Sequence, residues 1–324
     1  MASPGDWKIP ASVQPKPGDY AYDLDRALSA VVALSTRVPP EAFTADTLGT
    51  ERAGNGVVIR EDGLVLTVGY LIMEADTVWL TTHDGRSVPG HVVGFDAATG
   101  FGLVQALQPL KLPALPLGRS DTLGIGDRVV VAGAGGRGRS IAAQLIARQE
   151  FAGYWEYLLD DALFTAPSHP HWGGTALIGP AGDLLGIGSL QLQQGGASGA
   201  RAINMVVPID LLPPILDDLT ARGRPNRPAR PWLGLYATES DDGIVVMGLA
   251  DDGPAETAGL RAGDVVEAVA GEPAASLADF FRRVWALGDA GVRVPLTIRR
   301  DGRPLKLAVA SSDRERFLVS PQLH

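Results

Sequence analysis

The spacing of apolar residues near the start of the chain predicts a short helix. From Asp23, apolar side chains recur every three or four residues, which is the spacing of one helical face. The residues of this face are Leu24, Leu28, Val31, Val32 and Leu34. Asp23 or Asp25 would cap the first turn, and Pro39-Pro40 would stop the helix. Residues 1–22 are predicted to form an extended N-terminal arm with a frayed terminus.

The middle of the chain has the pattern of successive β-strands. Between Gly54 and Leu117, apolar runs are separated by turns, and the clearest hairpin signals are Glu61-Asp62-Gly63 and Asp84-Gly85. This pattern is typical of a closed antiparallel barrel. A second barrel is expected over residues 118–207, in which Asp127 to Ala132 has the composition of a strand.

A segment rich in proline and arginine separates the barrels from the C-terminal part. Residues 210–222 can form a helix that is interrupted near Pro213-Pro214, and Gly223 is a natural helix stop. The linker is predicted over residues 224–230. Beyond it, Ser276 is expected to cap a helix with an apolar face. This face comprises Leu277, Phe280, Phe281, Val284 and Leu287.

Composition favours a folded protein with more than one core. The chain has 324 residues, of which 45% are hydrophobic and 20% charged. Its net charge of -9 argues against non-specific nucleic-acid binding, which needs a basic surface, and leaves peptides and proteins as partners. The chain has no cysteine, and we see no secretory signal and no membrane span. We therefore expect a cytoplasmic protein, or a periplasmic one if translation begins elsewhere, and no cofactor.

Short motifs along the barrels resemble those of the HtrA/DegP-type trypsin-like serine proteases. These motifs are Gly54-Asn55-Gly56-Val57-Val58-Ile59, Asp62-Gly63, Leu66-Thr67, Ala75-Asp76, Asp84-Gly85-Arg86, Val92-Val93-Gly94, Asp96 and Leu115-Pro116-Leu117-Gly118. The segment from Ser168 to Leu177 is similar to the family's Gly-Asn-Ser-Gly-Gly-Pro-Leu, and Ala202 to Ile209 resembles its closing strand. The resemblance implies a trypsin-like double β-barrel over residues 23–223.

By this resemblance, Trp172 replaces the nucleophilic serine of the family, Tyr70 the base and Gly100 the orienting acid. An indole has no nucleophilic atom that a base can activate, and a phenol with a pKa of about 10 is a poor base at neutral pH. Pro170 stands where the family has a glycine N–H in the oxyanion hole, and proline has no N–H. We therefore predict a degenerate catalytic site. Trp172 is expected to fill the former cleft against Tyr70 or, alternatively, to anchor another ligand.

From residue 231 the chain resembles a PDZ domain of the HtrA type. The motifs are Trp232-Leu233-Gly234-Leu235, Gly253-Pro254-Ala255 and Ala258-Gly259-Leu260-Arg261-Ala262-Gly263-Asp264-Val265-Val266. A PDZ domain binds an extended peptide as an added strand, and its backbone N–H groups receive the C-terminal carboxylate. The resemblance implies a carboxylate-binding loop formed by Trp232, Leu233, Gly234 and Leu235. Phe281 or Val284 would contribute to the groove, although most apolar residues of that helix are expected in the core.

Three further patterns do not predict a site. Gly133 to Gly138 matches the dinucleotide-binding motif, but no strand–helix alternation surrounds it, so we interpret it as a permissive turn. Ser168 has His169 and His171 beside it in sequence, yet no acid is placed to orient a base. Two imidazoles without a third ligand seldom hold zinc, and we expect solvated loop histidines and no metal.

These patterns predict a mostly β protein, in which a chymotrypsin/trypsin-like double antiparallel β-barrel precedes an α+β PDZ domain. The expected limits are 1–22 for the arm, 23–223 for the barrels, 224–230 for the linker, 231–312 for the PDZ domain and 313–324 for the tail. The predicted function is that of an inactive HtrA-like pseudoprotease, a scaffold or adaptor that binds peptides or proteins. An active serine endopeptidase with a rearranged site and a structural subunit of a larger complex are the alternatives. A homotrimer is implied by the family alone.

Overall fold

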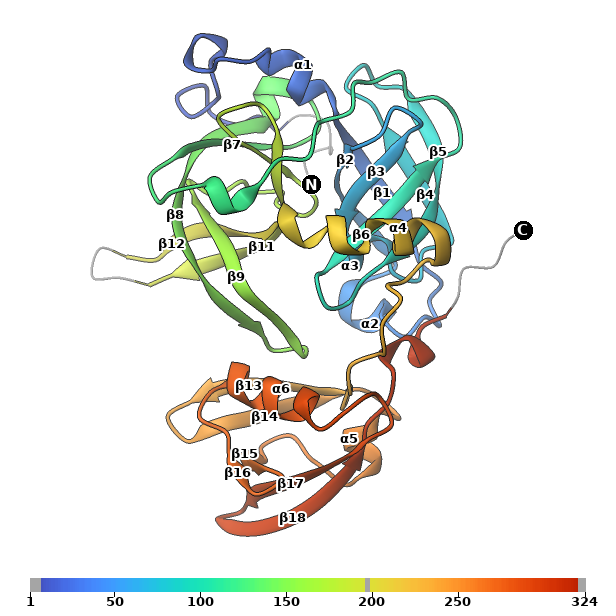
Figure 1. The fold of residues 1–324 in the computed structure, drawn as a ribbon, viewed down its shortest axis with the longest axis vertical. Coiled ribbons are helices and arrows are strands. Elements are labelled where there is room, and N and C mark those ends of the chain that lie inside the picture. Colours follow the sequence, from blue (N-terminus) through green and yellow to red (C-terminus); the bar gives the residue numbers. More distant parts are fainter. Residues whose placement is uncertain (1–6, 196–198, 320–324) are drawn as a thin grey trace. The chain divides into compact units, whose positions relative to one another are not determined.

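The computed structural model describes residues 7–195 and 199–319, which form two compact units (Figure 1). The first unit runs through Gln149, resumes at Asp161–Asn226 and takes in Val319. The second unit consists of Glu150–Asp160 and Arg227–Leu318. The tip of one long hairpin of the barrels therefore belongs to the same unit as the C-terminal domain.

The first six strands close into an antiparallel barrel in the order β1-β2-β3-β6-β5-β4. Their bounds are β1 (Val31–Arg37), β2 (Glu51–Val58), β3 (Leu64–Val68), β4 (Thr77–Thr81), β5 (Ser87–Phe95) and β6 (Phe101–Ala106). The barrel closes because β1 pairs with two partners, so that Leu34 lies opposite Gly54 on β2 and opposite Leu80 on β4. Short helices α2 (Ala45–Leu48) and α3 (Gly69–Ile72) lie in the connections. The barrel predicted from the strand pattern is confirmed.

The predicted first helix is wrong beyond Ser29. Helix α1 spans only Leu24–Ser29, and the Asp23 carboxylate caps it by accepting a hydrogen bond from the Arg26 N–H at 3.0 Å. Residues Val31–Arg37 form β1 instead. The valines at its start favour extended backbone, and pairing with two neighbouring strands outweighs the helical spacing of the apolar residues.

The second barrel is also closed, with the strand order β10-β11-β12-β9-β8-β7. Its strands are β7 (Arg128–Ala132), β8 (Ser140–Gly153), β9 (Tyr157–Ala166), β10 (Ala176–Ile178), β11 (Leu184–Gln194) and β12 (Arg201–Pro208). Helix α4 (Pro213–Arg222) follows, and Gly223 ends it at a φ of 75°, with its N–H donating to the Leu219 carbonyl at 2.9 Å. The described 3₁₀ turns are η1 (Pro17–Asp19), η2 (Ser120–Thr122), η3 (Gly136–Arg139), η4 (Ile209–Leu211) and η5 (Arg314–Phe317).

The N-terminal segment is packed from residue 7 onward, which corrects the prediction of a frayed arm for this stretch. Ile9 is buried in the core of the second barrel, and its N–H donates to the Gly138 carbonyl at 2.9 Å. The Val13 carbonyl accepts a hydrogen bond from the Ala142 N–H on β8 at 2.8 Å. The apolar residues among the prolines therefore anchor the segment along the barrel. Residues 1–6 lie outside the described residues.

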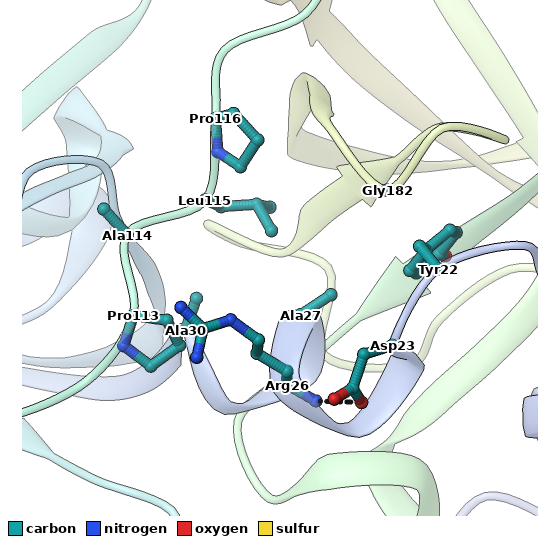
Figure 2. Close-up of a pocket in the computed structure, with 10 residues that line it drawn as sticks. All are labelled: Tyr22, Asp23, Arg26, Ala27, Ala30, Pro113, Ala114, Leu115, Pro116 and Gly182. Atoms are coloured by element: carbon teal, nitrogen blue, oxygen red, sulfur yellow. Dashed lines mark hydrogen bonds between the residues drawn. The ribbon is translucent and has the colours of Figure 1, made fainter.

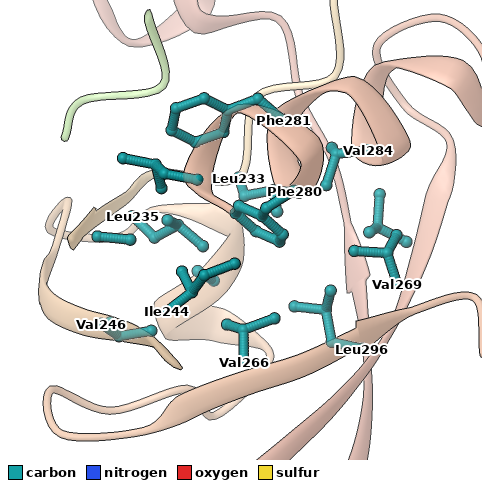
Figure 3. Packing of buried hydrophobic residues seen from close by; sticks show 14 of the residues in the cluster. Leu233, Leu235, Ile244, Val246, Val266, Val269, Phe280, Phe281, Val284 and Leu296 are labelled. Carbon is teal, nitrogen blue, oxygen red and sulfur yellow. The ribbon is translucent and has the colours of Figure 1, made fainter. Parts of the chain in front are cut away.

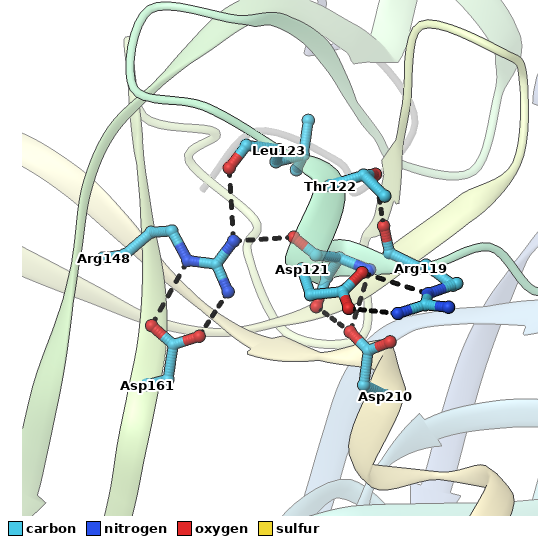
Figure 4. A network of polar contacts seen from close by, with 8 residues as sticks. Arg119, Asp121, Thr122, Leu123, Arg148, Asp161 and Asp210 are labelled. Atoms are coloured by element: carbon cyan, nitrogen blue, oxygen red, sulfur yellow. Dashed lines mark hydrogen bonds and ion pairs between the residues drawn. The ribbon is translucent and has the colours of Figure 1, made fainter.

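A polar network holds the turn η2 between the end of the first barrel and the start of the second (Figure 4). The Asp210 carboxylate accepts hydrogen bonds from the backbone N–H of Ser120, at 2.8 Å, and from its hydroxyl. The Arg148 guanidinium donates to the Ser120 carbonyl at 2.8 Å and pairs with Asp161. The backbone groups of this irregular turn are thus satisfied by charged side chains.

The second unit holds an antiparallel sheet and two helices of its own. The sheet order is β13-β14-β15-β17-β18, and β16 pairs with β15. The elements are β13 (Leu235–Ser240), β14 (Gly243–Leu249), α5 (Pro254–Thr257), β15 (Val265–Val269), β16 (Glu272–Pro273), α6 (Leu277–Ala286), β17 (Arg293–Arg300) and β18 (Arg303–Ala310). Ser276 caps α6 as predicted, because its hydroxyl accepts a hydrogen bond from the Asp279 N–H at 3.0 Å.

The core of this unit lies between α6 and the sheet (Figure 3). Phe280 points from the helix toward the sheet, Phe281 lies at the side of the helix, and both side chains are buried. Val284 is buried beside them in the same cluster. The three residues therefore act first as core, as most apolar residues of this helix are expected to do.

Within the first unit, the Asn55 side chain on β2 joins the two barrels. Its Nδ2 group donates to the carbonyls of His171, at 3.1 Å, and Gly173, at 3.0 Å. Its Oδ1 atom accepts a hydrogen bond from the Ala134 N–H at 2.9 Å, and the hydroxyl of Thr67 donates to its backbone carbonyl at 2.7 Å. Both the donor group and the acceptor atom of this buried amide are used to hold two loops of the second barrel against the first.

We expect Asn55→Asp to destabilise the protein by about 3 kcal/mol, because the carboxylate cannot donate to the two carbonyls and would be buried against them. Urea unfolding of the purified chain measures this change. The matched control is Asn226→Asp, at an exposed position, which should change the free energy of unfolding by less than about 0.5 kcal/mol. Equal stabilities of the two variants would contradict the role of Asn55.

Candidate functional site

The loop between β9 and β10 is built around a buried histidine. His169 is fully buried, and its backbone N–H donates to the Oδ1 atom of Asn204 at 2.5 Å. Its Nδ1 atom accepts a hydrogen bond from the His171 N–H at 3.1 Å, so its Nε2 atom carries the proton and donates to the Arg139 carbonyl at 2.9 Å. The prediction of a solvated His169 is wrong, because these partners are supplied by residues distant in sequence.

Both ring nitrogens of His169 are therefore occupied. Burial lowers the pKa of His169, so the neutral imidazole is favoured. The hydroxyl of the neighbouring Ser168 accepts a hydrogen bond from the Nε2 atom of Gln191 at 3.3 Å. His169 serves as a structural group of the loop and has no free nitrogen to act as a base for Ser168.

Tyr70, on α3, lies against the loop that carries Trp172. Its hydroxyl donates to the Ser189 carbonyl on β11 at 2.9 Å. Burial raises the pKa of Tyr70 above its usual range, and a hydrogen bond with the Trp172 side chain only partly opposes the shift. The space around the hydroxyl is narrow, because a Cβ atom added to Gly173 would lie 2.7 Å from it. The phenol is thus a fixed, protonated hydrogen-bond donor.

Gly100 lies in the turn between β5 and β6, next to the start of α3. It has a φ of 82°, and its carbonyl accepts a hydrogen bond from the Gly69 N–H at 2.7 Å. The structure therefore brings Gly100, Tyr70 and Trp172 to one region of the first unit, although they are about 30 to 100 residues apart in sequence. Pro170 is exposed in the same loop as Trp172. Gly100, Tyr70 and Trp172 offer no nucleophile, no base that titrates near neutral pH and no acid that could orient a base.

Trp7 packs on the same loop, a contact that sequence reasoning missed. Its ring lies 4.2 Å from the ring of His171 and 5.6 Å, edge-on, from that of His169. The guanidinium of Arg139 lies 4.7 Å from the centroid of the Trp7 ring. An isolated aromatic residue followed by Ile9 and Val13 was the only sequence signal for this packing.

A separate cavity of the first unit has a volume of about 150 Å³ (Figure 2). It is lined by Tyr22, Asp23, Arg26, Ala27, Ala30, Pro113, Ala114, Leu115, Pro116 and Gly182. The volume is below the range of about 300–1,000 Å³ that is usual for small-molecule sites. Within residues 7–195 and 199–319, no group of three His, Asp or Glu side chains is arranged to hold a metal ion.

The predicted carboxylate-binding loop of the second unit does hold a carboxylate, that of Glu156. The N–H groups of Leu233, Gly234 and Leu235 donate to the Glu156 side chain at 3.0, 2.7 and 3.1 Å. Trp232 and the two leucines are buried, and Gly234 has a φ of 74°, which favours glycine. Nothing in the sequence around Glu156 indicated this partnership, because it joins positions 77 to 79 residues apart.

Comparisons with known proteins agree with this two-part organisation. The model of the trypsin-like peptidase domain matches residues 54–187, and the model of the PDZ domain matches residues 231–310. Among solved structures, the chain resembles the HtrA-type protease AlgW with decapeptide, with 24% identity, a TM-score of 0.54, and 92% of this chain and 98% of that chain covered. A serine endoprotease from Yersinia pestis has a TM-score of 0.51. These likenesses show the fold.

Curated relatives are named as serine endoproteases. The chain is 27% identical over 289 residues to a probable periplasmic serine endoprotease DegP-like of Pseudomonas savastanoi pv. phaseolicola, covering 84% of this chain and 58% of the relative. It is 26% identical over 317 residues to the serine endoprotease DegS of Escherichia coli, covering 92% and 87%. The chain spans little more than half the length of the DegP-like relatives.

The cytoplasmic location expected from the sequence is wrong. The DegP-like relatives, and the DegQ protease of Escherichia coli, which is 27% identical over 336 residues with 93% of this chain and 72% of the relative covered, are named as periplasmic. In the part of the chain that the structure describes, no helix is long and apolar enough to cross a bilayer.

The domain matches follow the order of the fold. Residues 54–187 cover strands of both closed barrels, and residues 231–310 cover the sheet and helices of the C-terminal domain. DegS is matched across most of its own length. The chain is therefore HtrA/DegS-like, with a trypsin-like peptidase domain followed by one PDZ domain.

Proposed function

We propose that this chain is a catalytically inactive HtrA-like pseudoprotease that binds the C-termini of peptides or proteins through its PDZ domain. The observation that carries the proposal is the Trp172 indole, in contact with the partly buried Tyr70 phenol, in the loop where the resemblance puts the nucleophile. Neither group can attack a carbonyl carbon or accept a proton near neutral pH.

The chemistry of the surrounding groups supports this proposal. Hydrolysis of a peptide bond by this fold needs a nucleophile, a base, an orienting acid and donors for the oxyanion. Tyr70 stays protonated because burial raises its pKa, and Gly100 has no side chain. Pro170 has no N–H, and His169 has both ring nitrogens engaged. Each of the required roles lacks a suitable residue.

The PDZ domain, by contrast, has a loop suited to bind a carboxylate. The N–H groups of residues 233–235 converge on one oxygen pair, that of Glu156. Converging backbone donors of this kind recognise a carboxylate by geometry. We propose that a peptide binds here with its terminal carboxylate in this loop and its backbone along β13.

Two other functions are the alternatives to this proposal. The relatives are named as serine endoproteases, which favours an active enzyme with a rearranged site. A structural subunit is the third candidate, in which the barrels serve as an interaction platform.

We place the protein in the periplasm because of the names of its relatives, and a homotrimer stays a prediction.

We expect no serine-directed activity from the purified chain. A fluorophosphonate probe should not label it, because the probe needs an activated hydroxyl, and casein should not be cleaved above background. Escherichia coli DegS, labelled in parallel, is the positive control for the reagent. Labelling that disappears in Ser168→Ala would establish a rearranged site and overturn the proposal.

Restoring the three replaced positions should not restore proteolysis by itself. The variant with Trp172→Ser, Tyr70→His and Gly100→Asp still lacks the N–H that Pro170 cannot provide, and loss of one oxyanion donor costs about 10²–10³-fold in rate. The matched variant adds Pro170→Gly and should cleave casein about 100-fold faster than the triple variant. Circular dichroism checks that both are folded. Equal, high activity of the two variants would contradict the role given to Pro170.

The full chain should bind peptides only when their C-terminus is free. Fluorescein-labelled peptides ending in Leu, Val or Phe should bind about tenfold more tightly as free acids than as C-terminal amides. An uncharged amide accepts weaker hydrogen bonds from the N–H groups of residues 233–235 than a carboxylate does. Fluorescence polarisation measures both. Equal binding of acids and amides would rule out carboxylate capture by residues 233–235.

A further inference from the structure

The tip of the β8–β9 hairpin, Glu150–Asp160, belongs to the second unit. Strand β13 is the edge of the PDZ sheet, since β14 is its one sheet neighbour. On its open side, the Ala237 N–H donates to the Tyr154 carbonyl of the hairpin tip at 2.9 Å. The rings of Tyr154 and Tyr236 are 6.1 Å apart, edge-on. The hairpin tip thus lies along the sheet edge that a PDZ domain offers to a peptide.

Glu156 stands at the point where a peptide's terminal carboxylate would bind. Its Oε1 atom accepts hydrogen bonds from the N–H groups of Gly234, at 2.7 Å, and Leu235, at 3.1 Å. The Leu233 N–H lies 3.0 Å from Oε2 and 3.2 Å from Oε1. Every donor of the loop that the carboxylate of a ligand would need is therefore occupied by this side chain.

An apolar side chain of the hairpin tip is buried in the core of the second unit. Leu158 is buried, with 8% of its surface exposed, and belongs to the same core cluster as Leu233, Leu235 and Phe281. Outside this contact, the Arg282 guanidinium on α6 pairs with Glu150 and with Asp160. A backbone hydrogen bond, a carboxylate and an apolar side chain are the three features that a PDZ ligand presents.

Glu156 has an uncommon backbone conformation at the tip of the hairpin. Glu156 has a φ of 61°, in the left-handed region that glycine or asparagine occupies at little cost. The Trp155 ring stacks on that of Tyr157 at 5.5 Å, and Phe151 packs at 6.3 Å from Trp155. The hydrogen bonds from residues 233–235 to the Glu156 side chain offset part of the cost of this backbone conformation.

We propose that the hairpin tip is an internal ligand of the PDZ domain, with the Glu156 carboxylate in place of a peptide's C-terminal carboxylate and Leu158 filling apolar space beside it. An external peptide that ends in a free carboxylate and an apolar side chain binds only when the hairpin leaves. This inference rests on the proposed peptide binding, and it adds that the groove is closed in the free protein.

Closure weakens the apparent affinity for peptides, because only the open fraction of molecules can bind them. The tethered hairpin competes at a high effective concentration, so an open fraction of less than about one tenth is expected. Variants that lose the Glu156 contact should recover the intrinsic affinity of the groove.

The test compares binding of a fluorescein-labelled peptide that ends in leucine with a free carboxylate to full-length variants. Glu156→Ala should bind it at least about tenfold more tightly than the wild type, and Glu156→Gln should lie between them, because its amide oxygen still accepts hydrogen bonds. Asp241→Ala is the control, since it removes an exposed carboxylate from the β13–β14 turn of the same unit. Its affinity should equal that of the wild type.

The competition should also depend on pH. Desolvation raises the pKa of Glu156 to about 7, although hydrogen bonds from residues 233–235 and the charge of Arg314 oppose the shift. The Glu156 side chain accepts these hydrogen bonds whether it is protonated or ionised, but the closed state binds a proton more readily than the open state. Closure is therefore strongest below the ordinary pKa of a glutamate, and this advantage is lost as pH rises through about 7. Residues 227–318 contain no histidine, and Arg282 stays charged. Wild-type peptide affinity should rise from pH 5.5 to 8, and that of Glu156→Ala should stay constant.

The outcomes separate this inference from the proposed function. Equal, carboxylate-dependent binding by the wild type and Glu156→Ala would leave peptide capture in place and overturn the internal ligand. Where no variant binds any peptide, the proposed function fails, and the amide resonances of Leu233, Gly234 and Leu235 decide the inference. In ¹H–¹⁵N spectra, Glu156→Ala should shift all three, whereas Asp241→Ala should not. Unchanged resonances in Glu156→Ala would also overturn it.

Discussion

Buried backbone groups outside helices and strands need side-chain partners, and this constraint organises both units of the protein. The Asn55 side chain on β2 forms hydrogen bonds with three backbone groups in the loops of the second barrel. The loop after β9 depends in the same way on Asn204 and on the His169 ring. In the second unit, the amides of residues 233–235 depend on Glu156. Removal of any of these polar side chains would leave buried backbone groups unpaired.

The double-barrel fold does not depend on which residues stand at the catalytic positions of the family. Closed barrels require strand pairing, buried apolar faces and turns, and both barrels here have these features. Where the resemblance puts nucleophile and base, the Trp172 and Tyr70 side chains contact each other, and the Tyr70 hydroxyl donates to the Ser189 carbonyl.

A side-chain carboxylate can imitate the end of a chain because both present the same pair of oxygen atoms to the N–H groups of a PDZ loop. The hairpin tip combines that oxygen pair with a strand-like backbone contact at Ala237 and a buried Leu158. The same features that would make the loop a good receptor for an external peptide make it a receptor for Glu156. A tethered ligand also avoids the entropic cost of association, so modest contacts suffice to close the groove.

The sequence by itself determined the two barrels, the PDZ domain and the Ser276 cap, since these follow from local spacing, turns and motifs. Its local patterns failed where a distant partner decides the outcome. Val31–Arg37 has a helical spacing of apolar residues but becomes a strand because β2 and β4 pair with it. His169 lies in a polar loop sequence yet is buried by Asn204 and Arg139. Only the tertiary structure could place Glu156 against residues 233–235, because hydrogen bonds between segments so far apart leave no periodic signal along the chain.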